Sequence, residues 1–195
     1  MTVVIKLGGS LATAGTIRSW LRVIHECGAG RCVVVPGGGA FADAVRSAQQ
    51  CLAFSDRAAH VMALLAMEQY AVLLADLEPA LWPCASLEEI RAALDGNGVA
   101  LWLPHAMVSS EPSIAASWTV TSDSLAAWLA GCIRASHLVL VKSAPQPAPP
   151  LSPKQLAETG LVDAAFPGYV AAAGCTLGYC GPGEQGRLAE ALRLG

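Results

Sequence analysis

A short run of β-branched and apolar residues ends in two glycines near the start of the chain, VVIKLGGS at residues 3–10. The run predicts a buried strand, and the glycines allow a sharp turn and a close approach of the backbone to a ligand. Lysine inside a buried strand is rare unless it is paired. We therefore expect Lys6 to reach past the strand end towards an anion. The alternative is an ordinary first strand with an edge lysine.

A second unit repeats this layout. The apolar run at 32–35 leads into Pro36, Gly37, Gly38 and Gly39, and a helix pattern begins near Ala40. Two strand–glycine–helix units within about 50 residues are typical of parallel βαβ architecture. Backbone amides at such turns, next to a helix N-terminus, suit phosphate binding. We expect a three-layer α/β/α sandwich with a mainly parallel central sheet.

Further periodic segments extend this prediction along the chain. Strands are expected at 99–103, 137–142 and 175–180, and loops at 107–117 and 143–153. The remaining segments predict helices, which we place at about 17–28, 40–48, 55–76, 86–96, 124–133, 153–160, 166–173 and 184–194.

Composition narrows the functional classes. The 195 residues are 54% hydrophobic and 14% charged, with a net charge of −3 that does not favour nucleic-acid binding. The apolar stretch 61–77 contains Glu68, Gln69 and Asp76, so we expect a core helix rather than a membrane span. The seven cysteines form no CxxC pair, and no basic-then-apolar leader opens the sequence. These features predict a single cytoplasmic α/β domain over 1–195, without membrane or nucleic-acid partners.

The helix expected at 55–76 carries apolar residues on almost every side. Such a helix is covered either by other elements of the same chain or by a second subunit. Both alternatives remain open, and the second predicts a homo-oligomer.

Four segments, taken together, resemble the amino acid kinase superfamily: IKLGGS at 5–10, VPGGG at 35–39, TSDSLA at 121–126 and LVLVK at 138–142. The chain looks most similar to a small branch, the aminomethylfuran phosphate kinases, through GGGAFADAVR at 37–46 and segments within 59–70 and 161–167. This resemblance implies an ATP-dependent kinase that acts on a small phosphorylated substrate. Residues 1–135 would bind the acceptor and transfer the phosphoryl group.

One segment departs from the family pattern. Family members usually follow the fourth strand with an acidic, glycine-containing loop near the nucleotide, whereas this chain has SAPQPAPP at 143–150. Residues 136–195 would then form a reduced nucleotide-binding part. The alternatives are another acceptor of the superfamily (acetylglutamate, isopentenyl phosphate or UMP) or a non-catalytic ligand-binding or assembly relative.

The resemblance implies roles at the acceptor side of the site. Lys6 would stabilise charge on the transferred phosphoryl group, and Gly37, Gly38 and Gly39 would bind the acceptor's phosphate. Asp123 would orient Lys6 rather than act as a base. The alternative for Asp123 is a helix N-cap without a catalytic role.

Other residues are assigned to the nucleotide side. The amide groups of Gly8 and Gly9 can hold phosphate oxygens, and Ser10 belongs to the same turn. Lys142, at the end of the fourth strand expected from the pattern, is a candidate for the ATP side or an ordinary solvated lysine. Mg²⁺ would arrive with ATP and be held mostly by phosphates and water.

An aminomethyl substrate carries a cation at neutral pH, so its site should offer a carboxylate. Asp43 lies four residues past Gly39, about one helical turn from the predicted phosphate site. We therefore expect Asp43 to bind the amine, with Glu68 as the second candidate. His60 is interpreted as a hydrogen-bonded core histidine.

Overall fold

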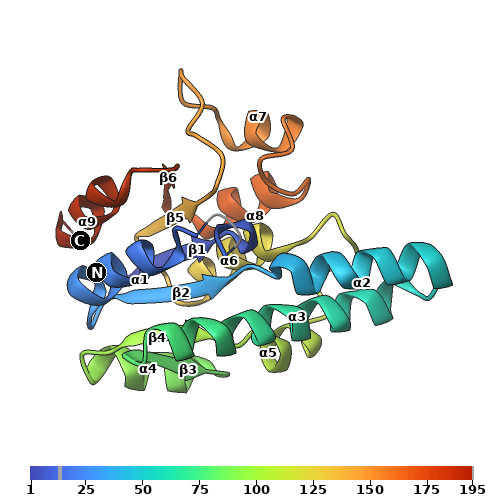
Figure 1. The fold of residues 1–195 in the computed structure, drawn as a ribbon, viewed down its shortest axis with the longest axis horizontal. Coiled ribbons are helices and arrows are strands. Elements are labelled where there is room, and N and C mark those ends of the chain that lie inside the picture. Colours follow the sequence, from blue (N-terminus) through green and yellow to red (C-terminus); the bar gives the residue numbers. More distant parts are fainter. Residues whose placement is uncertain (13–14, 195) are drawn as a thin grey trace.

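A computed structural model describes residues 1–12 and 15–194. Its centre is a sheet of parallel strands in the order β3-β4-β2-β1-β5-β6, with helices on both faces (Figure 1). The predicted three-layer α/β/α sandwich is confirmed, and the described sheet is wholly parallel. The strands are β1 (Val3–Leu7), β2 (Cys32–Pro36), β3 (Leu81–Cys84), β4 (Val99–Trp102), β5 (His137–Val141) and β6 (Thr176–Cys180).

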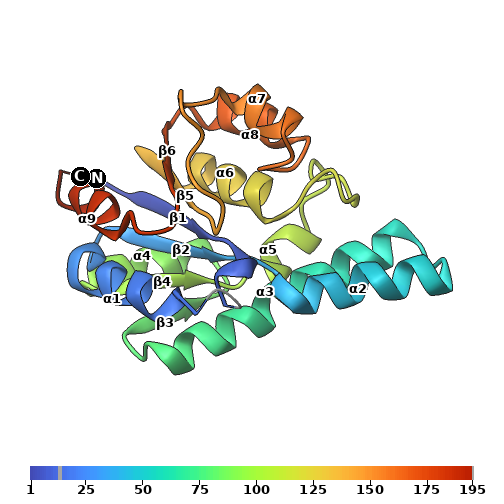
Figure 2. The same cartoon turned by 45° about the horizontal axis from the view of Figure 1, so that its top comes forward.

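Two groups of helices cover the sheet. One face packs against α1 (Ile17–Gly28), α9 (Gln185–Leu194) and the C-terminal part of α3 (Asp56–Leu77). The other face packs against α4 (Leu87–Asp95), α6 (Ser122–Cys132) and α8 (Phe166–Ala173). Helix α2 (Gly39–Leu52) and the N-terminal half of α3 lie side by side and extend beyond the sheet (Figure 2). The shorter elements are η1 (Gly9–Leu11), α5 (His105–Ser109) and α7 (Pro153–Glu158).

The alternation of side chains along β1 decides where Lys6 points. Val3, Ile5 and Leu7 belong to the core cluster under α1 and α9, whereas Val4 belongs to the cluster under α6. Because successive residues of a strand face opposite sides, Lys6 shares the α6 side with Val4. The lysine is 4% exposed, so the sheet delivers a buried ammonium group to the α6 layer.

Helix α3 is long and apolar enough to cross a membrane, by length and composition alone. Glu68, Gln69 and Asp76 therefore do not exclude a membrane span, contrary to the argument made from the sequence. Packing is the better argument: Leu64 and Met67 join one core cluster, and Tyr70, Ala71 and Leu74 join the other. The helix thus takes part in the packing of both sheet faces.

Two elements differ from the sequence prediction. The edge strand β3 was not predicted, because its four residues include Pro83, which is tolerated only at sheet edges. Helix α5 occupies part of the predicted loop. The predicted helix starts at Ser55, Ser86 and Ser152 are confirmed, since each side chain accepts a backbone N–H of its helix.

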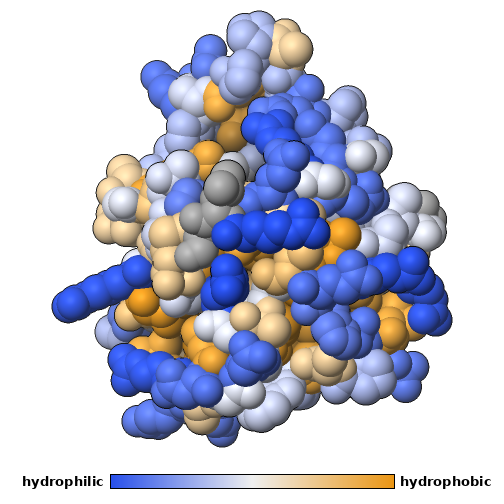
Figure 3. All heavy atoms as spheres, turned by 90° about the vertical axis from the view of Figure 1, so that its left-hand side faces the viewer, coloured by the Kyte–Doolittle hydropathy of each residue, from blue (hydrophilic) through white to orange (hydrophobic). Residues whose placement is uncertain are grey.

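On the face around the two termini, hydrophilic and apolar side chains are intermixed (Figure 3).

Candidate active site

The two glycine turns pack directly on each other. A Cβ on Gly9 would lie 2.2 Å from the backbone N of Gly39, and a Cβ on Gly37 would lie 2.4 Å from the backbone N of Gly9. Gly39 also has φ +52°, a conformation that favours glycine. These residues are therefore required for backbone-to-backbone contact, a role that the sequence interpretation had not considered.

Two amides of these turns are already used by the sheet. The N–H of Gly8 donates to the carbonyl of Val141 at 2.9 Å, and the N–H of Gly37 donates to the carbonyl of Leu7 at 2.9 Å. Gly9, Gly38 and Gly39 line the pocket described below, whereas Gly8 and Gly37 do not. Gly8 and Gly37 thus support the turns, and their amides are not available for the phosphate contacts expected from the sequence.

A buried carboxylate joins two lysines at the end of the central strands. Asp123 Oδ1 lies 3.0 Å from Lys6 Nζ and 2.7 Å from Lys142 Nζ, and Lys142 Nζ also donates to Asp123 Oδ2 at 2.8 Å. The pairing follows from the register: Lys6 is opposite Leu140 on β5, and Lys142, two residues further, shares that face. The cluster carries one carboxylate for two ammonium groups.

The charge balance of this cluster shifts its titration. Burial alone would raise the pKa of Asp123, but Lys6 and Lys142 outweigh it and hold that pKa below its usual range. Burial, together with repulsion from Lys6, lowers the pKa of Lys142 to about 8. Lys142 therefore loses its proton in mildly alkaline solution, and an incoming anion would favour its charged form.

Asp123 does not cap α6. The N-cap is Thr121, whose side chain makes no capping bond to the helix, and the backbone amides of Thr121 and Ser124 are instead held by Asp163 from the segment before α8. Asp123 lies in the first turn with its carboxylate turned to the lysines. The N-cap alternative for Asp123 is thereby excluded, and Asp163 is a residue that sequence reasoning did not assign.

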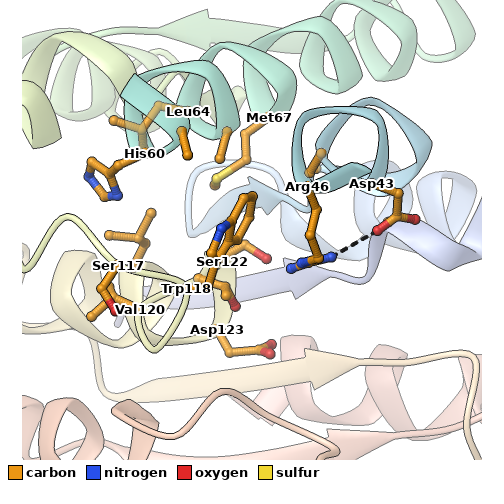
Figure 4. A pocket seen from close by; sticks show the side chains of 18 of the residues that line it. Asp43, Arg46, His60, Leu64, Met67, Ser117, Trp118, Val120, Ser122 and Asp123 are labelled. Atoms are coloured by element: carbon orange, nitrogen blue, oxygen red, sulfur yellow. Dashed lines mark hydrogen bonds and ion pairs between the residues drawn. The ribbon is translucent and has the colours of Figure 1, made fainter. Parts of the chain in front are cut away.

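A pocket of about 270 Å³ opens beside this cluster, between α2, α3 and the segment that leads into α6 (Figure 4). Lys6 and the amides of Gly38 and Gly39, at the N-terminus of α2, supply a positive end. The opposite wall is largely apolar: Ala59, Ala63, Leu64, Met67 and Val120. His60, interpreted from the sequence as a core histidine, also lines this pocket, and burial lowers its pKa.

Two further lining residues were not assigned from the sequence. The guanidinium of Arg46 lies 4.3 Å from the centre of the Trp118 ring, and Trp118 Nε1 donates to Gln49 Oε1 at 2.6 Å. Helix α2 thus holds the tryptophan of the 110–120 segment over the pocket, as Figure 4 shows for Arg46 and Trp118. Arg46 is also paired with Asp43 at 3.0 Å, so this rim of the pocket carries both signs of charge.

The acidic candidates separate into two environments. Asp43 lines the pocket, is 72% exposed at its side chain and accepts a hydrogen bond from Arg46 at 3.0 Å. Asp56 also lines the pocket and accepts from Gln49 at 2.8 Å. Glu68 is not among the lining residues. Its carboxylate accepts from the backbone N of His105 at 2.9 Å, because a helix N-terminus attracts negative charge.

On the other side of the cluster the proline-rich loop packs against the end of β6. Tyr179 Oη donates to the carbonyl of Ala144 at 3.0 Å, and Ser10 and Ser143 join their hydroxyl groups at 2.7 Å. A smaller hollow of about 150 Å³ lies beside the loop. It is lined by Gln146, Pro147, Pro150, Leu151, Leu156, Leu177, Gly178, Tyr179 and Arg187.

Several known proteins are similar to this chain. It is 25% identical over 138 residues to the [5-(aminomethyl)furan-3-yl]methyl phosphate kinase of Methanocaldococcus jannaschii, covering 70% of this chain but only 63% of that protein. The uridylate kinase of Archaeoglobus fulgidus has a similar structure, with a TM-score of 0.72, 20% identity, and coverage of 99% of this chain and 96% of that one.

Two further solved structures share the fold. The UMP kinase of Ureaplasma parvum has a TM-score of 0.67 at 16% identity, over 93% of this chain and 90% of that chain. The carbamate kinase of Giardia lamblia, solved with AMP-PNP, has a TM-score of 0.64 at 12% identity, over 98% and 95%. The model of the amino acid kinase family matches residues 1–146, most of the chain. The chain therefore belongs to the amino acid kinase family.

Proposed function

We propose that this protein is an ATP-dependent kinase that phosphorylates a small phosphorylated acceptor. The observation that carries the proposal is the buried cluster of Lys6, Asp123 and Lys142, set at the end of a pocket whose floor is formed by two interlocked glycine turns. Family membership and the kinases among the similar proteins support it.

The geometry suits transfer between two polyanions. An oxygen of the acceptor phosphate would attack the γ-phosphorus of ATP; the new phosphorus–oxygen bond forms as the bond to ADP breaks. The nucleophile is already anionic, so positioning and charge stabilisation suffice. In this proposal Lys6 stabilises the charge on the transferred group, and Asp123 fixes both lysines. The amides of Gly38 and Gly39 hold the acceptor's phosphate, and Lys142 contacts the donor side.

The nucleotide would bind beside the cluster. The hollow near the proline-rich loop combines apolar walls with Tyr179 and Arg187, which suits a flat base and an adjacent phosphate. In residues 1–12 and 15–194, no group of three or more His, Cys, Asp or Glu side chains could hold a metal ion. Mg²⁺ would accordingly be held by the phosphates of ATP and by water.

For the acceptor we propose [5-(aminomethyl)furan-3-yl]methyl phosphate, which would be converted to the diphosphate. The similar protein of that name supports this choice, as does a pocket with a positive end, an apolar wall and two carboxylates away from the lysine cluster, Asp43 and Asp56. Asp43 remains the first candidate for the amine. Asp56 is a second one on geometric grounds, because it lines the pocket and Glu68 does not.

Turnover with paired acceptors tests the proposal. The purified protein is given ATP, Mg²⁺ and either the aminomethylfuran phosphate or an amine-free phosphate such as isopentenyl phosphate, and kcat/KM is measured. We expect the amine to be preferred, and expect Asp43→Asn or Asp56→Asn to weaken the use of that acceptor alone. Both carboxylates are exposed in the structure, so we expect the loss to be about 1 kcal/mol, or roughly fivefold in kcat/KM. Preference for the amine-free compound would overturn the choice of acceptor.

A non-catalytic relative is the rival function, favoured by the departure of the 143–150 loop from the family pattern. Thermal denaturation with ATP and Mg²⁺ distinguishes the two. A ligand that binds only the folded state stabilises it by RT ln(1 + [L]/Kd), so millimolar ATP at micromolar affinity gives a clear rise in Tm. The absence of such a rise would favour the rival.

We further propose that the protein works in the cytoplasm as a homo-oligomer. All seven cysteines lie outside disulfides in the structure, as is typical of reducing compartments.

The homo-oligomer rests on an exposed apolar stripe of α3. Met62, Leu65 and Val72 follow helical spacing along one side of the helix and are 40%, 41% and 69% exposed. A second copy covering this stripe would remove it from water. Sedimentation of a 20 kDa monomer at micromolar concentration would contradict the oligomer.

A further inference from the structure

Asp163 accepts hydrogen bonds from two different helices. Its Oδ2 accepts from the backbone N of Thr121 at 2.9 Å, from Thr121 Oγ1 at 2.8 Å and from the backbone N of Ser124 at 3.0 Å. Its Oδ1 accepts from Ser124 Oγ and, at 3.0 Å, from the backbone N of Phe166. One half-buried carboxylate thus accepts from two backbone amides at the start of α6 and from one at the start of α8.

The position of these contacts connects them to the site. The two backbone amides that Asp163 holds on α6, those of Thr121 and Ser124, flank Asp123 in the sequence. Asp123 is 5% exposed, and its oxygens lie 2.7–3.0 Å from the two ammonium groups. A displacement of this turn by a fraction of an ångström would therefore change the contacts of Asp123 with both lysines.

We propose that Asp163 is the positioning residue of this site: by holding the first turns of α6 and α8 together, it sets where Asp123 meets Lys6 and Lys142. The inference rests on the proposed function for its kinetic consequence. Asp163 does not line the pocket, and it acts only through Asp123.

The same contacts reduce the capacity of α6 to bind an anion. The N-terminus of α6 has a favourable electrostatic field for an anion, but the Asp163 carboxylate already occupies its Thr121 and Ser124 amides. The negative charge of Asp163 offsets this field. Lys6 and the N-terminus of α2, on the other side of the pocket, are therefore the stronger candidates for anion binding.

The lysine content of the chain allows a direct test. Lys6, Lys142 and Lys154 are its only lysines, and Lys154 is 83% exposed at its side chain, so it serves as an internal reference. The folded protein is labelled with acetic anhydride at pH 8, and mass spectrometry measures the labelling rate of each lysine. Burial and pairing should make Lys6 slower than Lys154 in the wild type. For Lys142, burial slows labelling while its lowered pKa favours it, so the ratio of Lys142 to Lys154 in the wild type is the reference value.

Asp163→Asn keeps the size of the side chain but replaces one acceptor oxygen with a donor that faces N–H groups. We expect the labelling rate of Lys142 to rise several-fold relative to Lys154, and kcat to fall at least tenfold with a less than threefold change in the KM of ATP. Ser124→Ala, which removes one donor and leaves the carboxylate, should change both quantities in the same direction by less. If Asp163→Asn fails to fold, Ser124→Ala still tests the proposal.

Ser86→Ala is the matched control. It removes a helix cap from α4, away from the pocket, and should lower Tm without changing the labelling ratio. The proposal is overturned if the ratio of Lys142 to Lys154 labelling in Asp163→Asn and Ser124→Ala equals that of the wild type. If the wild type transfers no phosphoryl group to any acceptor, the proposed function fails, while the labelling ratios still decide the role of Asp163.

Discussion

The two sides of the Lys6–Asp123–Lys142 cluster are built in different ways. On the proposed acceptor side, the turns after β1 and β2 pack backbone against backbone, with glycine required at Gly9 and Gly37. On the other side, the 143–150 loop packs less closely against the backbone of Gly181, and side-chain bonds such as that from Tyr179 to Ala144 and that between Ser10 and Ser143 hold it. The proposed acceptor side is fixed by the sheet itself, whereas the loop depends more on side-chain contacts.

This difference indicates how the two halves can vary. Turns that interlock through their backbones have no tolerance for side chains, so an acceptor site of this kind can change only in the residues that surround it. A loop held by a few hydrogen bonds can be replaced without disturbing the sheet. Within this fold, the 143–150 segment can therefore depart from the family pattern while the Lys6 strand and its turns keep it.

The largest expected effect concerns Lys6, where the two halves meet. Lys6→Ala should lower kcat by about 100-fold or more, equivalent to about 2.7 kcal/mol, because it removes charge stabilisation from the transition state. The fold should survive, since Asp123 keeps Lys142 as its partner. Lys154→Ala, an exposed lysine, is the matched control. Near-normal turnover in Lys6→Ala would show that the cluster is structural only.

A pair of glycine variants sharpens the comparison directly. Gly9→Ala places a Cβ 2.2 Å from the backbone of Gly39, whereas Gly181→Ala places one 2.9 Å from the backbone of Gln146 in the loop. Overpacking costs about 1–3 kcal/mol and occasionally more. We expect Gly9→Ala to reach or exceed the upper end, because the overlap is deep and lies between two turns anchored to the sheet. Gly181→Ala should lie at the lower end, because its overlap with the loop backbone is shallower. Chemical denaturation measures both. Equal losses of stability would remove the proposed distinction.

The fold could be predicted from local pattern wherever a strand is buried on both faces. The strands β1, β2, β4 and β5 are continuous apolar runs, and each was found near its observed position. Strand β3 was not predicted, because an edge strand with exposed Trp82 and Pro83 lacks that pattern. The partly buried edge strand β6 was nevertheless found near its observed position, so it is the proline and the exposed tryptophan of β3 that hide this strand.

The site was predictable in part, for the same reason. Lys6 was recognised because a lysine in a buried strand is locally anomalous. The contact of Asp163 with Thr121 spans 42 residues, and that of Trp118 with Gln49 spans 69, so no local pattern marks either. Lys142 could have been placed beside Lys6 by alternation, but only once β5 was known to be the neighbour of β1.

An intermediate effect concerns the pH dependence of stability. The pKa of Lys142 is about 8 in the folded protein against an ordinary 10.5, so between these values the unfolded chain binds more protons. Its contribution to the free energy of unfolding therefore rises from pH 8 to pH 10.5, by at most about 1.4 kcal/mol per pH unit.

Other buried groups act in the opposite direction over the same pH range. Burial raises the pKa of Cys84 and Cys180 to about 11, so the unfolded chain loses these protons first and stability falls as pH rises. The difference in unfolding free energy between wild type and Lys142→Met isolates the lysine, because both proteins share the thiols. A difference that stays flat from pH 8 to pH 10.5 would contradict the lowered pKa of Lys142.

The smallest effect is expected where the loop meets β6. Tyr179→Phe removes the hydrogen bond to the carbonyl of Ala144 and should cost about 1 kcal/mol of stability at most. If the loop shapes only the nucleotide side, this energy should appear in the KM of ATP, as a rise of up to about fivefold. Both kcat and the KM of the acceptor should stay near wild type, because Lys6 and the glycine turns are untouched. Tyr169→Phe on α8 is the control for loss of a hydroxyl elsewhere. Steady-state kinetics with each substrate varied in turn provide the measurement. A large fall in kcat with an unchanged KM of ATP would mean that the loop sets the position of the transferred group, and the two sides of the cluster would not be independent.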